Sequence, residues 1–143
     1  MNTKTKLVVG AVSFLLIMTL IAVGLLVYYS SKPAQFLITT EHLEIKGLYG
    51  EKIYFDNINE ITLAESLPEI ISRTNGAALG NKMKGYFRLA EIGKAKLFVN
   101  LASSPFVFIH RETKPVVIIN CDTESETKEL FAALLAEWQK KQE

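Results

Sequence analysis

The sequence predicts an N-terminal transmembrane helix followed by one mainly β (α+β) domain that ends in a helix. Three observations predict this organisation. Residues 7–29 contain no charged side chain. Residues 35–121 hold short runs rich in β-branched and aromatic residues, with turn residues between them. Residues 123–140 carry apolar side chains at helical spacing.

The uncharged segment is long enough to cross a bilayer. At about 1.5 Å rise per residue its helix is roughly 34 Å long, against a hydrocarbon core of about 30 Å. We interpret it as an uncleaved anchor, preceded by a short tail (1–6) and followed by a linker (30–34), in a single-pass protein of the cell membrane. The alternative is a signal peptide cleaved near Ala22-Val23-Gly24, although a cleavable apolar region is typically about 7–15 residues long.

Basic residues at the two ends of the segment predict its orientation. Lys4 and Lys6 precede it, whereas Lys32 alone follows closely. The positive-inside rule then places the N-terminus in the cytoplasm and the soluble domain (35–143) outside. Because the linker provides at most roughly 17 Å of extended chain, the domain is expected to stay near the membrane surface.

The domain is expected to contain seven or eight antiparallel strands. The expected strands are 36–39, 43–46, 52–55, 57–63, 83–90, 94–101, 106–110 and 116–121. A different pattern interrupts them: Ser66-Leu67-Pro68-Glu69 has the spacing of a capping box with proline in the first turn, and Asn75-Gly76 favours a helix stop. We therefore expect a short helix over 67–74, within a long connection that reaches Lys82.

The chain closes with an amphipathic helix that ends near Lys140. Thr123-Glu124-Ser125-Glu126 has the spacing of a second capping box. The apolar stripe of this helix comprises Leu130, Phe131, Leu134, Leu135 and Trp138. Such a stripe has to be buried, so the helix is expected to cap the sheet.

Three short segments carry a resemblance to a known family. They are Lys46-Gly47-Leu48-Tyr49-Gly50, Leu67-Pro68 with Arg73-Thr74-Asn75-Gly76, and Gly85-Tyr86-Phe87. Together with the order of the elements, over about residues 35–139, they resemble a bacterial pleckstrin-homology (PH)-like domain family. Members of this family often carry membrane-spanning segments, and their role is mostly unassigned. The resemblance implies strands in two near-orthogonal layers with the final helix at one open end.

Charge limits what the domain can bind. It holds 13 basic and 15 acidic residues, a balance that argues against a nucleic-acid partner. Residues 35–72 hold only Lys46 and Lys52 against seven acids, so the first hairpins would repel a phosphoinositide headgroup. Basic residues gather instead between Arg73 and Lys96, where six of them accompany one acid.

Strand alternation predicts one cationic and aromatic outer face on the hairpin 83–101. The candidate interaction face comprises Lys84, Tyr86, Arg88, Lys96 and Phe98. We interpret it as a docking face for an acidic partner or for anionic lipid headgroups; the alternative is an ordinary solvated sheet face. A second candidate is a recognition tip at Arg73 and Asn75, for which the alternative is a turn that only ends a helix.

No arrangement of residues predicts catalysis, a metal site or a cofactor. His42 and His110 have no Cys or acid at ligand spacing. Cys121, the only cysteine, is expected to be a small buried side chain. The sequence contains no Gly-rich phosphate loop, Ser-centred elbow or paired carboxylates.

The expected function is therefore a membrane-anchored, non-catalytic binding or assembly module that acts on another membrane-associated protein or on itself. The alternative is recognition of anionic lipid by the face that carries Lys84, Arg88 and Lys96. A small-ligand barrel or an enzyme is a third alternative, which would need a pocket lined by convergent polar groups.

Overall fold

A computed structural model describes all 143 residues, which form two units, Met1–Lys32 and Pro33–Glu143. The first unit is helix α1 (Thr3–Ser31), which is long and apolar enough to cross a membrane. A signal sequence near the N-terminus can meet the same criteria of length and composition. The helix extends past the expected segment 7–29 at both ends, so parts of the expected tail and linker are helical.

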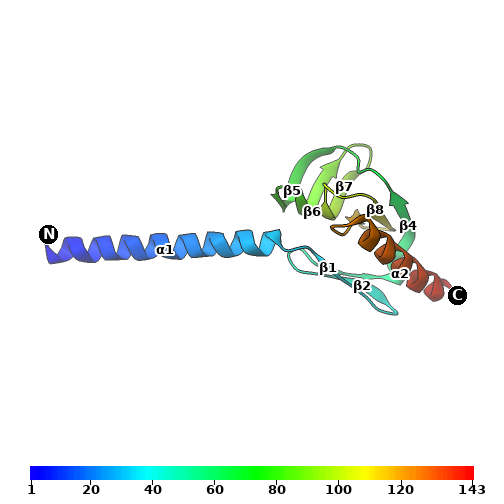
Figure 1. Cartoon of the computed structure of the whole chain (residues 1–143), viewed down its shortest axis with the longest axis horizontal. Coiled ribbons are helices and arrows are strands. Elements are labelled where there is room, and N and C mark those ends of the chain that lie inside the picture. The colour runs from blue at the N-terminus through cyan, green and yellow to red at the C-terminus, as the bar shows by residue number, and fades with distance from the viewer. The chain divides into compact units, whose positions relative to one another are not determined.

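The second unit contains nine strands, one 3-10 helix and a terminal α-helix (Figure 1). The elements are β1 (Gln35–Ile38), β2 (His42–Lys46), β3 (Lys52–Tyr54), η1 (Phe55–Asn57), β4 (Ile58–Ala64), β5 (Ile70–Leu79), β6 (Lys82–Leu89), β7 (Gly93–Asn100), β8 (Phe106–Arg111), β9 (Val116–Ile119) and α2 (Glu124–Gln142). They form a three-stranded sheet in the order β1-β2-β3 and a six-stranded sheet in the order β4-β8-β9-β7-β6-β5.

The expectation of seven or eight antiparallel strands is wrong in number and in direction. The additional strand, which the sequence patterns do not predict, is β5. In addition, β9 pairs with β7 in parallel. The hairpin of β8 and β9 folds back so that β9 lies between β8 and β7. Sequence patterns give each strand separately and do not specify which non-consecutive strands become neighbours.

The short helix expected over 67–74 is not formed. Residues 65–69 run as an irregular connection, and the chain then enters β5, which pairs with β6 from Ile70 to Leu79. The backbone of Glu69 also accepts a hydrogen bond from the N–H of Ala90 at 2.8 Å. The stability of an isolated helix of two turns is marginal. In the sheet, by contrast, β6 provides hydrogen-bond partners for the backbone of alternate residues of β5, whose first residues include β-branched Ile70 and Ile71.

Side chains on the two faces of the six-stranded sheet enter two different hydrophobic cores. On β7, Phe98 packs in the first core with Leu43 of the smaller sheet and Leu134 of α2. Leu97, its neighbour, packs in the second core with Phe87. The smaller sheet and α2 cover the first face, and half-buried side chains of the β4–β5 connection and β5 cover the second. Strand β7 therefore has almost no solvent-facing side.

The C-terminal helix is confirmed, including its cap and its buried stripe. The Thr123 side chain accepts a hydrogen bond from the N–H of Glu126 at 3.2 Å. The five predicted stripe residues all pack in or against the first core, and α2 contacts β1, β8 and η1. One turn inside the helix, the buried Thr127 hydroxyl accepts from the N–H of Cys121 at 2.9 Å and donates to the Thr123 carbonyl.

Replacement of Gly85 by alanine should destabilise the domain strongly. Gly85 has a φ of +101°, and a Cβ there would lie 2.7 Å from both the Asn75 carbonyl oxygen and the Gly76 Cα. Because these are backbone atoms of the paired strand, Gly85→Ala should lower the free energy of unfolding by about 2–4 kcal/mol. Urea unfolding of the full-length protein in detergent, followed by fluorescence of the single tryptophan Trp138, measures this change.

Gly93→Ala is the matched control. Gly93 also has a positive φ, +81°, but a Cβ there would meet no atom within 4 Å. We expect it to cost only about 1 kcal/mol. Equal losses in the two variants would show that the close approach of β5 and β6 does not constrain the fold.

Candidate functional site

The β6–β7 pairing places the five candidate face residues on one side of the larger sheet. Lys84 lies opposite Phe98, and Tyr86 lies opposite Lys96. The prediction that this side faces outward is wrong, because Lys84, Lys96 and Phe98 are 5%, 6% and 2% exposed. Tyr86 is half-buried and only Arg88 is exposed. The side belongs to the first core, which the smaller sheet and α2 cover from distant parts of the sequence.

Lys96 is held in an ion-pair network between the two sheets. Its Nζ lies 3.1 Å from Glu51 Oε1, and Arg111 Nη1 lies 3.0 Å from Glu51 Oε2. Arg111 also donates to the Pro115 carbonyl through Nε at 3.0 Å and Nη2 at 2.8 Å. Since the side chains of Lys96 and Arg111 are 7% and 4% exposed, Glu51 supplies the negative charge for two buried cations. This network stabilises the packing of the sheets and is not available to a partner.

Replacement of Glu51 by glutamine should lower the free energy of unfolding by about 3 kcal/mol, because two buried cations lose their counter-charge. Urea unfolding followed by Trp138 fluorescence measures the loss. Glu124→Gln is the control: Glu124 pairs with Lys128 on the exposed surface of α2, where an ion pair contributes little. Unfolding of both variants at the same urea concentration would contradict a role for Glu51 in joining the sheets.

A smaller cationic surface remains in solvent. We call it the cationic corner and define it by Arg88, Lys94 and Tyr86. Lys94 Nζ lies 4.8 Å from the centroid of the Tyr86 ring, within the range of a cation–π contact. Arg88 and Lys94 are both exposed and lie directly opposite each other across β6 and β7. Like charges in opposing positions repel, so an anion bound beside them would stabilise this part of the sheet.

Lys84 lines a cavity of about 260 Å³, which we call the Lys84 cavity. Lys82 and Lys84 of β6 line it, and so do Asp122, which directly precedes the cap of α2, and Glu126 in the first turn of α2. Burial lowers the pKa of the Lys84 ammonium, and the charge of Lys82 lowers it further. A titratable group that is buried, perturbed and placed at a cavity is a candidate for a functional site.

Cys121 lies at the same cavity and is half-buried, not fully buried as expected. Burial raises the pKa of its thiol, and the carboxylates of Glu126 and Asp122 raise it further, while a hydrogen bond with Thr127 opposes them. The thiolate is the reactive form of cysteine. Cys121 is therefore a poor nucleophile at neutral pH, and its position gives no support to covalent catalysis.

Glu126→Gln should speed the alkylation of Cys121 by iodoacetamide. Removing the carboxylate lowers the pKa of the thiol, so the thiolate fraction at a given pH rises and the curve of rate against pH moves to lower pH. Mass spectrometry of the alkylated protein across neutral and alkaline pH measures the shift. Glu124→Gln, on the exposed surface of the same helix, should leave the curve unchanged. A slower reaction in Glu126→Gln would contradict the electrostatic effect.

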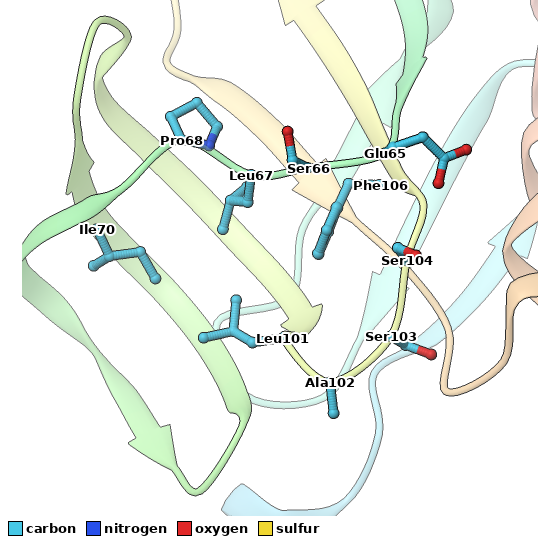
Figure 2. A pocket seen from close by; sticks show the side chains of 10 residues that line it. All are labelled: Glu65, Ser66, Leu67, Pro68, Ile70, Leu101, Ala102, Ser103, Ser104 and Phe106. Carbon is cyan, nitrogen blue, oxygen red and sulfur yellow. The ribbon is translucent and has the colours of Figure 1, made fainter.

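A larger cavity, of about 530 Å³, lies between the β4–β5 connection and the β7–β8 connection. Figure 2 shows the side chains of Leu67, Ile70, Leu101 and Phe106 around a common space, with the Glu65 carboxylate pointing away from it. Its lining contains no Lys, Arg, His or Cys. The cavity is continuous with the second core and can accept an apolar group, but it holds no pair of side chains suited to acid–base or nucleophilic chemistry.

Arg73 and Asn75 do not form a loop tip, so that prediction is wrong. Both lie within β5, opposite Phe87 and Tyr86 of β6, and both are exposed along the edge of the larger sheet. The turn that ends β5 comes later, at Gly80. The turn preference of Asn75-Gly76 is overridden because Gly76 is needed for the close approach to β6.

The two histidines make separate local contacts. The His42 ring lies 5.2 Å from that of Tyr54, and the His110 ring lies 6.3 Å from that of Phe108. No group of three or more His, Cys, Asp or Glu side chains is placed to hold a metal ion.

Sequence reasoning missed several residues of these sites. Glu51, Arg111, Asp122 and Glu126 were not assigned a site, and Lys94 was counted only within the basic run. Strand alternation could have placed Lys94 beside Arg88. No local signal could have found Glu51, because its two cations lie 45 and 60 residues away in the sequence.

No known protein family, curated protein or solved structure matches this chain. Its function has to be inferred from its own residues.

Proposed function

We propose that this protein is a membrane-anchored, non-catalytic binding module, with α1 as an uncleaved anchor and the domain of residues 33–143 outside the cytoplasm. The length and composition of α1 support the anchor, and Lys4 and Lys6 ahead of the apolar segment support the orientation. A domain held this way has a high effective concentration for neighbours in the same membrane. The partner is another membrane-associated protein or a second copy of the chain.

We also propose that the domain belongs to the PH-like folds. Two sheets with a C-terminal helix packed on the core between them support this proposal. Two of the segments that carry the resemblance, 46–50 and 85–87, also lie close together, which supports the proposal. The ring of Tyr49 approaches Gly85 so closely that a Cβ on Gly85 would lie 3.2 Å from it. The parallel pairing of β7 and β9 is a departure from an antiparallel fold.

The cationic corner is the proposed contact surface for an acidic partner. The observation that carries this proposal is the exposed pair of like charges, Arg88 opposite Lys94, with Lys94 over the Tyr86 ring. Carboxylates of a partner would relieve the repulsion between these two cations and gain charge-assisted hydrogen bonds. The chain itself carries exposed acids, among them Glu41, Asp56, Glu60, Glu65 and Glu69. Self-association in which acids of one copy contact the cationic corner of another fits the same chemistry.

Recognition of anionic lipid is the competing proposal, and burial weakens it. Of the three cations that it requires, Lys84 and Lys96 are buried and only Arg88 is exposed. Lys94 would have to take their place.

Charge reversal at the cationic corner tests the proposed function. The double variant Arg88→Glu with Lys94→Glu should lose crosslinks between the full-length protein and its neighbours in native membranes by about tenfold or more, because like-charge contacts at an interface cost several kcal/mol. The control is Lys46→Glu with Lys114→Glu, which changes the net charge equally at exposed positions outside the corner.

Unchanged crosslinks in the corner variant, or equal losses in both variants, would reject this surface. If the crosslinks persist and only the amount of co-purified anionic lipid falls, the lipid proposal is correct instead. Trp138 fluorescence reports whether each variant is folded.

A further inference from the structure

The lining of the Lys84 cavity contains both basic and acidic residues. Lys82 and Lys84 belong to β6, Asp122 directly precedes the cap of α2, and Glu126 lies in the first turn of α2. Its volume of about 260 Å³ is below the range of about 300–1,000 Å³ that is typical of pockets for drug-sized ligands. The cavity therefore suits a small group that carries a negative and a positive charge a few bonds apart.

We propose that the Lys84 cavity binds the headgroup of phosphatidylethanolamine, with the phosphate against Lys82 and Lys84 and the primary ammonium against Asp122 and Glu126. An ammonium of this kind offers three N–H donors, and a carboxylate only accepts. The two carboxylates would repel the headgroup of an anionic lipid that lacks an ammonium. This site is separate from the cationic corner, so it does not depend on the proposed partner contact.

The position of the cavity in the chain favours a lipid over a soluble zwitterion. Pro33 and Ala34 form part of its lining, and α1 ends at Ser31. Only Lys32 separates Ser31 from Pro33, so roughly 7 Å of extended chain joins the end of the apolar helix to this lining. If α1 spans the bilayer, lipid headgroups are the zwitterions present at the highest concentration at that distance.

The contacts that these side chains already make leave room for a ligand. Lys82 and Lys84 each already make an interaction, and an ammonium with three donors can keep such a contact while it also donates to a phosphate oxygen. Asp122 accepts from Asn100 Nδ2 through Oδ1 at 3.0 Å, which leaves its second oxygen for the headgroup ammonium.

Lipid binding to the full-length protein tests this proposal. The protein is purified in detergent, depleted of lipid and titrated with short-chain phosphatidylethanolamine, phosphatidylcholine or phosphatidylglycerol, and native mass spectrometry measures the bound lipid. Phosphatidylethanolamine should bind about tenfold more tightly than phosphatidylcholine, whose quaternary ammonium donates no hydrogen bond. Soluble O-phosphoethanolamine should bind more weakly than the lipid.

Variants at the basic and the acidic lining residues separate the two halves of the headgroup. Lys84→Met should weaken phosphatidylethanolamine binding about tenfold, whereas Lys46→Met, at an exposed position outside the cavity and the cationic corner, should not change it. Glu126→Gln should reduce the preference for phosphatidylethanolamine over phosphatidylcholine. If Lys84→Met does not fold, as judged by Trp138 fluorescence, Lys82→Met takes its place.

Equal binding of phosphatidylethanolamine and phosphatidylcholine by the wild-type protein would overturn the proposal. Preference for phosphatidylglycerol would overturn it too, and so would equal effects of Lys84→Met and Lys46→Met. Binding of O-phosphoethanolamine as tight as that of the lipid would assign the cavity to a soluble zwitterion and reject the lipid.

Discussion

The burial of β7 on both faces is the constraint on which the rest of the domain depends. Phe98 and Leu97 are neighbours in the sequence, yet they lie in separate hydrophobic cores. Between Ala95 and Val99 this strand has no solvent side on which to place charged residues. The lysines on β6 and β7 that face the first core must therefore meet a counter-charge or a polar cavity inside the protein.

The basic residues between positions 82 and 96 meet three different environments as a result. Lys96 pairs with Glu51 in the interior, and Lys84 lies at a cavity whose lining also includes Asp122 and Glu126. Arg88 and Lys94, closer to the β6–β7 turn, remain in solvent. One run of positive charge in the sequence thus becomes a structural ion pair, a candidate ligand site and a candidate partner surface.

Sequence patterns predict a secondary-structure element correctly where the contacts that stabilise the element are local. The cap at Thr123 and the stripe from Leu130 to Trp138 specify α2, because a helix forms its hydrogen bonds within itself. The local signals for a helix over 67–74 lie at Ser66 to Glu69, just ahead of β5, and Ile70 to Thr74 belong to the strand instead. This segment forms a strand because β6 supplies its hydrogen bonds across the sheet, and the turn signal of Asn75-Gly76 serves a close approach of two strands instead.

The amino-acid sequence is sufficient to predict an apolar helix followed by a β-rich domain, the positions of eight of the nine strands, and the side chains of β6 and β7 that share a face. It does not predict that this face is covered, that Glu51 joins Lys96 to Arg111, or that β9 runs beside β7. These two groups of features differ in the range of the interactions that produce them. Alternation along a strand is set by the geometry of adjacent residues, whereas what covers a face depends on segments that the chain brings back from far away.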